Sequence, residues 1–224
     1  MRGELNPWWR AGLAIASPIV RLVFRVRIEG IEHVPSRGPA ILAFNHVSVL
    51  DGPVLAILVG QRLGRETRFL VAAEQFDKLL TGWILRRYDQ IPIRRGERDA
   101  RALDVATETI RRGALAGVAP EGRVNEVGAR DLQRVRSGIA RIAIPTGAPI
   151  VPVGIWGSQD RWPRGGVRWH RWWRRPKLGI ALGAPLLPAG EDVFDDAVEG
   201  LRVRVGQRLA EQVEAARLLA DARP

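Results

Sequence analysis

The sequence AILAFNHVSVLDG, residues 40–52, joins a continuous apolar run to a polar turn and the start of a new helix. The run Ala40–Phe44 is short and wholly apolar, which suits a strand buried on both faces. His46 follows this strand almost directly, and Asp51 stands where a predicted helix begins. In α/β folds, functional side chains lie at the carboxyl ends of the strands. His46 and Asp51 are therefore candidate catalytic residues.

A histidine that acts as a general base needs a carboxylate on its second ring nitrogen. The carboxylate fixes the tautomer of the ring and stabilises the imidazolium that forms in the transition state. A turn between a strand end and a helix start can bring His46 and Asp51 together in this way. Two plainer interpretations exist: Asp51 as a helix cap, and His46 as a hydrogen-bonded core histidine. The His-x4-Asp pattern taken alone favours the plainer interpretations.

The rest of the chain alternates apolar runs of strand length with segments of helical periodicity. This alternation predicts an α/β fold: a single domain with a mostly parallel mixed sheet flanked by helices, preceded by an N-terminal amphipathic helix. We expect the helix within residues 1–24 and the domain at residues 25–224. The predicted strands are Phe24–Ile28, Ala40–Phe44, Arg68–Ala72, Gln90–Ile93, Leu115–Ala119, Pro149–Ile155 and Leu178–Leu182. The predicted helices are Gly52–Val59, Glu97–Arg112, Leu132–Ile144 and Val193–Leu219.

The composition excludes several kinds of active site. The chain has 224 residues and no cysteine, which excludes disulfides, thiolate metal sites and a cysteine nucleophile. His33, His46 and His170 are scattered, so we expect no histidine-based metal cluster. The formal net charge of +11 predicts anionic partners, such as phospholipid headgroups, nucleic acid or phosphorylated small molecules.

Two segments combine tryptophan with arginine. Trp8-Trp9-Arg10 precedes an apolar stretch that ends at Phe24, which is shorter than the ~20 apolar residues of a spanning helix. It suits a helix lying in the membrane interface or, alternatively, an ordinary helix packed on the domain. The second segment, Trp156–Lys177, suits an anionic membrane surface, single-stranded nucleic acid, or plain packing on the domain.

Two further predicted strands end in residues that suit an anionic substrate. Glu121-Gly122-Arg123 follows the strand Leu115–Ala119, and Arg94 and Arg95 follow the strand Gln90–Ile93. A glycine permits close backbone approach, and an arginine offers a fork suited to phosphate. If these strands are neighbours of Ala40–Phe44, a base and a phosphate clamp face one crevice. The plainer interpretation of the arginines is surface solubility.

At these residues the chain resembles the glycerolipid acyltransferase family, specifically the 1-acylglycerol-3-phosphate acyltransferases. Four sequence blocks of the family occur here in order between about Ile28 and Ser158. They are Asn-His-x4-Asp at Asn45, His46 and Asp51; a strand ending in arginine at Arg95, or alternatively Arg94; Pro-Glu-Gly-Thr-Arg at Pro120, Glu121, Gly122 and Arg123; and a proline-rich strand at Ala148–Val153. The third block lacks its threonine, so Arg123 stands one residue early and Val124 takes the usual place of the arginine.

The resemblance implies an enzyme of phospholipid biosynthesis that moves a fatty acyl group from acyl-CoA or acyl-carrier protein to the hydroxyl group of 1-acylglycerol-3-phosphate. It implies catalysis by His46 and Asp51 without a covalent acyl-enzyme, a metal or a cofactor. The substrate-binding residues that it implies are Asn45, Arg94, Arg95, Glu121, Gly122 and Arg123.

The implied partners are a phospholipid membrane surface, a lysophosphatidic acid-like acceptor and the acyl donor, with the protein peripheral on the cytoplasmic face of the cell membrane. Two alternatives are acylation of another lipid or lipid-linked acceptor and, in a different class, a basic nucleic-acid-binding module. With the enzyme interpretation, no nucleic acid is expected as a partner.

Overall fold

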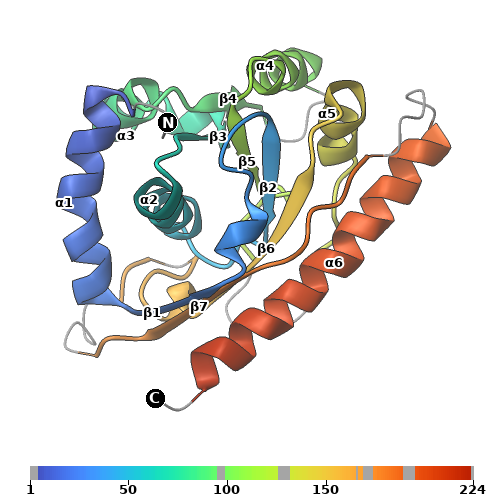
Figure 1. The fold of residues 1–224 in the computed structure, drawn as a ribbon. Helices are drawn as coiled ribbons and strands as arrows, with labels where there is room; N and C mark the ends of the chain where they lie inside the picture. The colour runs from blue at the N-terminus through green and yellow to red at the C-terminus, as the bar shows by residue number, and fades with distance from the viewer. Residues whose placement is uncertain are drawn as a thin grey trace.

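The computed structural model describes residues 5–94, 99–125, 132–164, 166–168, 174–188 and 195–222. These residues form three layers, in which one sheet lies between two layers of helices (Figure 1). The architecture confirms the predicted α/β fold, with a mostly parallel mixed sheet flanked by helices.

The sheet consists of seven strands, each within one residue of its predicted bounds at either end. They are β1 (Arg25–Glu29), β2 (Ala40–Phe44), β3 (Thr67–Ala72), β4 (Ile91–Ile93), β5 (Leu115–Val118), β6 (Ile150–Trp156) and β7 (Lys177–Leu182). Their spatial order is β1-β7-β6-β2-β5-β3-β4. All neighbours pair parallel except β6 and β7, which pair antiparallel. β1 and β7 therefore run opposite to the other five strands.

The helices agree with the predictions less closely than the strands. They are α1 (Pro7–Val23), α2 (Asp51–Leu63), α3 (Leu79–Arg87), α4 (Ala100–Arg111), α5 (Gly138–Thr146) and α6 (Asp195–Asp221). The predicted helix Leu132–Ile144 is wrong in its first part, because the N–H of Arg136 donates to the carbonyl of Pro120 at 2.9 Å instead of joining a helix. The predictions contain no helix at α3, whose one buried residue is Gly82. The first residues of the helices predicted at 97–112 and 193–219 lie outside the described residues.

Two apolar cores hold the helices to opposite faces of the sheet. The first core joins α1 and α2 to the sheet, and the second joins α4, α5 and α6 to it. β2 contributes Leu42 and Phe44 to the first core and Ile41 and Ala43 to the second. Alternate residues of a strand point to opposite faces, so a central strand covered on both sides must be apolar throughout. The apolar run at the start of the 40–52 stretch meets this requirement.

The predicted N-terminal helix is present as α1. The side chain of Asn6 caps it by accepting the N–H of Trp9 at 3.0 Å, and Pro7 stands in its first turn. Trp9 and Val20 are buried on its inner side. The placement of α1 in a membrane interface, and the division into residues 1–24 and 25–224, stay predictions. Across the described ranges, no helix combines the length and the apolarity that crossing a membrane requires.

α6 lies very close to β6 and β7 (Figure 1). A Cβ atom on Gly154 of β6 would stand 1.9 Å from the carbonyl oxygen of Gln212, and one on Gly179 of β7 would stand 1.9 Å from that of Ala216. Glycine at these two positions therefore lets the backbone of the helix approach the backbone of the sheet.

We expect Gly154→Ala to lower the free energy of unfolding by at least about 1–3 kcal/mol, because the added methyl group would push α6 off the sheet. Gly200→Ala in α6 is the matched control, since a Cβ there meets no atom within 4 Å. It should raise stability by about 0.5–1 kcal/mol through helix propensity. Urea denaturation of both variants measures this, and equal effects would contradict the close packing of α6.

Candidate active site

The side chains of His46 and Asp51 meet at the carboxyl end of β2. Nδ1 of His46 lies 3.0 Å from Oδ2 of Asp51. Because an ionised carboxylate only accepts hydrogen bonds, Nδ1 donates, and Nε2 of the neutral ring keeps its lone pair. The side chain of His46 is 17% exposed and that of Asp51 is 0% exposed. A substrate can therefore reach the imidazole while the carboxylate stays covered.

The carboxylate of Asp51 accepts three further hydrogen bonds. Its Oδ2 accepts the backbone N–H groups of Val47 at 2.8 Å and Ser48 at 2.7 Å, and its Oδ1 accepts the hydroxyl of Ser158 at 2.5 Å. Ser158 begins the short helix η3 (Ser158–Asp160), which follows β6. These contacts close the turn between β2 and α2 and fasten it to the end of β6. No sequence pattern predicts Ser158, because only the fold brings it to Asp51.

Asn45 ties the end of β2 to β6. Its Nδ2 donates to the carbonyl of Ile155 at 3.0 Å, and its Oδ1 accepts the N–H of Ile155 at 2.7 Å. Both contacts are buried, and they fix the residue that immediately precedes His46. Asn45 is thus a positioning residue in this structure, and its predicted role in binding substrate stays a prediction.

Glu121 holds the backbone of His46 from the other side. Its Oε1 accepts the N–H of His46 at 2.9 Å, and its Oε2 accepts the N–H of Gln133 at 3.0 Å. The N–H of Asn125 donates to the carbonyl of His46 at 2.5 Å, so the loop after β5 is hydrogen-bonded to both the N–H and the carbonyl of His46. Burial raises the pKa of Glu121, although the two backbone N–H groups act in the opposite direction.

Two arginines lie beside Glu121. Gly122 has a φ of +75°, and a Cβ atom there would stand 2.9 Å from Nε of Arg136, so the side chain of Arg136 lies over this turn. Nε of Arg123 donates to Oε1 of Gln133 at 2.8 Å. The sequence patterns missed Arg136, which precedes α5 and is brought close to Glu121 by the hydrogen bond from its N–H to the carbonyl of Pro120, in the loop after β5.

Arg94 follows a strand that is not a neighbour of β2. β5 is a direct neighbour of β2, but β4 is the edge strand, separated from β2 by β5 and β3. At about 4.8 Å per strand, the end of β4 is about 14 Å from the end of β2. The N–H of Arg94 donates to Asp99 at 2.8 Å, and its side chain is exposed. Arg95 lies outside the described residues, so its predicted role stays a prediction.

The tryptophan- and arginine-rich segment begins at the site. The carbonyl of Trp162 accepts the hydroxyl of Ser48 at 2.7 Å, beside the Asp51 turn. Residues 165 and 169–173, which include His170 and three of the tryptophans, lie outside the described residues. The predicted contact of this segment with a membrane stays a prediction.

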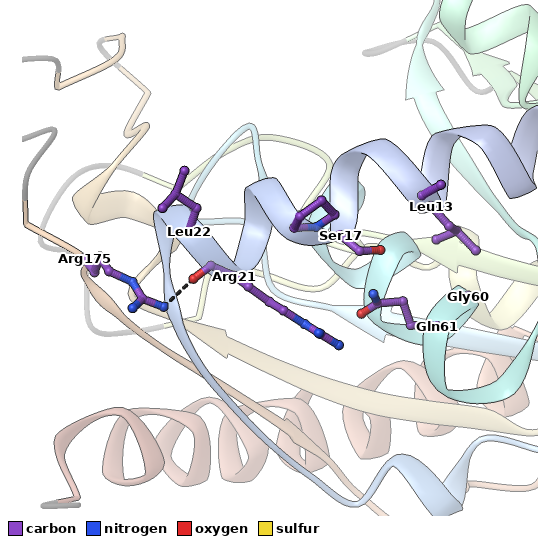
Figure 2. A pocket seen from close by; sticks show the side chains of 9 residues that line it. Leu13, Ser17, Arg21, Leu22, Gly60, Gln61 and Arg175 are labelled. Atoms are coloured by element: carbon purple, nitrogen blue, oxygen red, sulfur yellow. Dashed lines mark hydrogen bonds between the residues drawn. The ribbon is translucent and has the colours of Figure 1, made fainter.

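A groove of about 770 Å³ lies between α1 and α2 (Figure 2), and His46 is not among the residues that line it. Its lining contains none of the predicted site residues and consists of Leu13, Ala14, Ser17, Pro18, Arg21, Leu22, Gly60, Gln61 and Arg175. Within the described ranges, no three histidine, aspartate or glutamate side chains gather in a way that suits a metal ion. That the protein needs no metal or cofactor stays a prediction.

The chain is similar to known proteins over most of its length. Residues 25–156 match the Acyltransferase family. An uncharacterised protein of Mycobacterium leprae is 35% identical over 164 residues, which cover 67% of this chain and 42% of that protein. A lyso-ornithine lipid O-acyltransferase of Pseudomonas aeruginosa is 30% identical over 164 residues, which cover 73% of this chain and 57% of that protein.

A solved structure has the same fold. The crystal structure of PlsC, the 1-acyl-sn-glycerophosphate (LPA) acyltransferase from Thermotoga maritima, matches with a TM-score of 0.74 and 25% identity, covering 96% of this chain and 81% of that chain. The match with the mycobacterial relatives spans less than half of their length.

We expect the stability of the wild type, relative to Glu121→Gln, to fall as the pH rises above the ordinary pKa of a glutamate. Burial raises the pKa of Glu121 in the folded protein, so the folded state holds this proton more tightly than the unfolded state. The stabilisation is present in full below the unfolded-state pKa and is lost as the pH rises through the folded-state pKa. Urea denaturation of both proteins between about pH 4 and 8 measures the difference. A relative stability that increased with pH would contradict the prediction.

Proposed function

The chain belongs to the Acyltransferase family, and from that premise we propose that it transfers a fatty acyl group from acyl-CoA or acyl-carrier protein to the hydroxyl group of 1-acylglycerol-3-phosphate. The observation that carries this proposal is the pairing of His46 with the buried Asp51 at 3.0 Å. An imidazole held in this tautomer is a suitable general base for a hydroxyl group. The family favours an enzyme over the nucleic-acid-binding alternative.

The reaction that this pair supports is a direct transfer. Nε2 of His46 removes the proton of the acceptor hydroxyl as its oxygen attacks the thioester carbonyl carbon, and the imidazolium is stabilised by Asp51. The tetrahedral intermediate then breaks its carbon–sulfur bond and leaves an ester. The thiolate takes the proton from Nε2, which restores neutral His46. No side chain is acylated in these reaction steps, in keeping with a chain that has no cysteine.

Arg123 is the side chain that we propose for the acceptor phosphate, with further positive charge from Arg94 and Arg95. Its guanidinium is bonded to Gln133, whose own N–H is bonded to Glu121, so the arginine belongs to the loop that holds His46. A guanidinium binds phosphate through two parallel hydrogen bonds. In this proposal Glu121 and Gly122 fix the shape of the loop after β5 and do not contact the phosphate themselves.

The acceptor and the product are amphiphiles, so we propose that the protein works as a peripheral protein at the cytoplasmic face of the cell membrane. Trp8 is exposed near the start of α1 and Arg10 follows it, which suits the headgroup level of a bilayer. Each arginine near an anionic surface contributes about 1 kcal/mol of attraction, which salt screens.

A second candidate acceptor is a lyso-ornithine lipid or a similar lipid without phosphate. Two observations favour it: the third block lacks its threonine, which displaces Arg123, and the Pseudomonas aeruginosa relative is a lyso-ornithine lipid O-acyltransferase. The two candidates differ in whether the acceptor carries a phosphate. An acceptor screen with labelled acyl-CoA, performed on purified protein, separates them.

We expect His46→Ala to lower the rate of acyl transfer by about 10²–10⁴-fold, because the general base is removed. Asp51→Asn should also be severe, since an amide in place of the carboxylate favours the wrong tautomer. Release of the free thiol from acyl-CoA, with and without 1-acylglycerol-3-phosphate, measures the rate. His33→Ala is the control, because the ring of His33 contacts Leu182 and lies outside the site. Full turnover by a folded His46→Ala protein would overturn the mechanism.

We expect Arg123→Ala to raise the KM for a phosphorylated acceptor by an amount equivalent to about 1.5–3 kcal/mol, because hydrogen bonds to a charged group are lost. Arg123→Lys should recover only part of this, since lysine lacks the bidentate fork. Arg101→Ala removes the same charge from the exposed surface of α4 and controls for net charge. Steady-state kinetics with 1-acylglycerol-3-phosphate and with lyso-ornithine lipid measure the effect. An unchanged KM for the phosphorylated acceptor would remove Arg123 from the phosphate site.

A further inference from the structure

α3 presents its apolar side chains to solvent. Leu79 is 94% exposed and Leu80 is 70% exposed, and Trp83 and Ile84, one helical turn later, are exposed as well. Gly82 is the one residue of α3 that is buried. The apolar side of this helix is therefore not used by either core of the protein. A set of large apolar side chains left exposed together marks a surface for a partner or a membrane.

α1 shows the same division. Ile15, Ile19 and Leu22 are exposed at three- and four-residue spacing, and Leu22 is 73% exposed. Trp9 and Val20 face inward on the same helix. α1 thus has an inner apolar side that packs on the protein and an outer apolar side that is largely exposed.

Aromatic contacts join the two exposed sides into one surface. The rings of Trp8 on α1 and Trp83 on α3 meet edge to face with centroids 5.5 Å apart. The guanidinium of Arg87 lies 4.8 Å from the ring centroid of Trp8, and the hydroxyl of Tyr88 donates to the carbonyl of Trp8 at 3.0 Å. Figure 1 shows α3 next to the start of α1. We call Trp8, Ile15, Ile19, Leu22, Leu79, Leu80, Trp83 and Ile84 the α1–α3 surface.

Within α1 and α3, every charged residue is basic. α1 contains Arg10 and Arg21, α3 ends in Arg86 and Arg87, and neither helix contains an aspartate or a glutamate. At the end of α1, Arg175 donates to the carbonyl of Arg21 beside Leu22, at the rim of the groove (Figure 2). Apolar side chains bordered by arginines complement an anionic lipid surface, whose headgroups are negative and whose interior is apolar.

The strand directions place this surface next to the active site. β3 is parallel to β2 through β5, so α3, which follows β3, begins at the edge of the sheet where His46 lies. β1 runs opposite to β2, so the end of α1, which precedes β1, lies at that same edge. Leu22 and Leu79, at the end of α1 and the start of α3, are therefore on the His46 side of the molecule.

We propose that the α1–α3 surface binds the surface of an anionic bilayer, with α3 as a second membrane-contacting helix beside α1. α3 has 9 residues, too few to cross a bilayer, so in this arrangement it lies in the plane of the interface, as proposed for α1. The role of this binding rests on the proposed function: the α1–α3 surface would hold the catalytic edge of the sheet against the leaflet that supplies a lipid acceptor. The binding itself is measurable without any reaction.

The test compares two double variants in co-sedimentation with vesicles of phosphatidylcholine and phosphatidylglycerol, across a salt series. Leu79→Gln with Leu80→Gln removes apolar contact from α3 and leaves all charges unchanged. Val105→Gln with Leu218→Gln makes the same change at exposed apolar residues of α4 and α6, which cover the other face of the sheet. We expect the partition coefficient of the α3 variant to fall by at least about tenfold and that of the control to stay unchanged.

Other outcomes would overturn the proposal. Wild-type binding by the α3 variant would remove α3 from the membrane surface, and an equal loss in the control variant would show that no particular face binds. If the wild type is a dimer that the α3 substitutions dissociate, the partner is a second copy of the chain and not a membrane. Thermal unfolding of all variants checks that they fold. Vesicle binding without thioester release with any acceptor would refute the proposed function and leave the α1–α3 surface standing.

Discussion

A buried carboxylate is stable in a protein only when its oxygens are hydrogen-bonded, and the site of this protein depends on how that requirement is met at Asp51. The carboxylate accepts the imidazole of His46, two N–H groups of its own turn and the hydroxyl of Ser158. The turn cannot open, nor can the end of β6 shift, without leaving a buried acceptor unpaired. The orientation of His46 is therefore set by the fold and does not depend on a bound substrate.

Two other buried polar side chains, next to His46 in the structure, also have their polar atoms hydrogen-bonded. Asn45 gives both atoms of its amide to the backbone of Ile155, and Glu121 uses both oxygens on backbone N–H groups of two different loops. Asn45 and Glu121 thus use their polar atoms to fix the backbone around His46. The exposed part of the imidazole and the nearby guanidinium groups are left to contact a substrate. The burial that raises the pKa of Glu121 is a consequence of this placement.

The two helical layers differ in what they leave exposed. α4, α5 and α6 share one core with the sheet, and α6 lies so close to it that two glycines are needed. α1 buries one side and exposes a second apolar side, and α3 buries little besides a glycine. For a protein whose proposed acceptor is a lipid, an incompletely covered face next to the catalytic edge gives access to the layer in which that lipid lies.

The sequence by itself determined the strands, because period-two and fully apolar runs follow from local contact with two covering layers, and each strand was predicted within one residue at either end. It also predicted that a short turn between a strand end and a helix start can bring the side chains of His46 and Asp51 together, and in the structure they meet at 3.0 Å. The tertiary structure alone decided the rest. Ser158 reaches Asp51 across 107 positions in the sequence. β4 is the outer strand, so Arg94 lies about three strand spacings from β2. Strand order and long-range contacts arise from packing among distant segments, which no local pattern encodes. The tertiary structure also decided that the apolar side of α3 is exposed. The sequence of an apolar helix face is the same whether the face is buried or exposed, because exposure depends on the segments that pack around the helix.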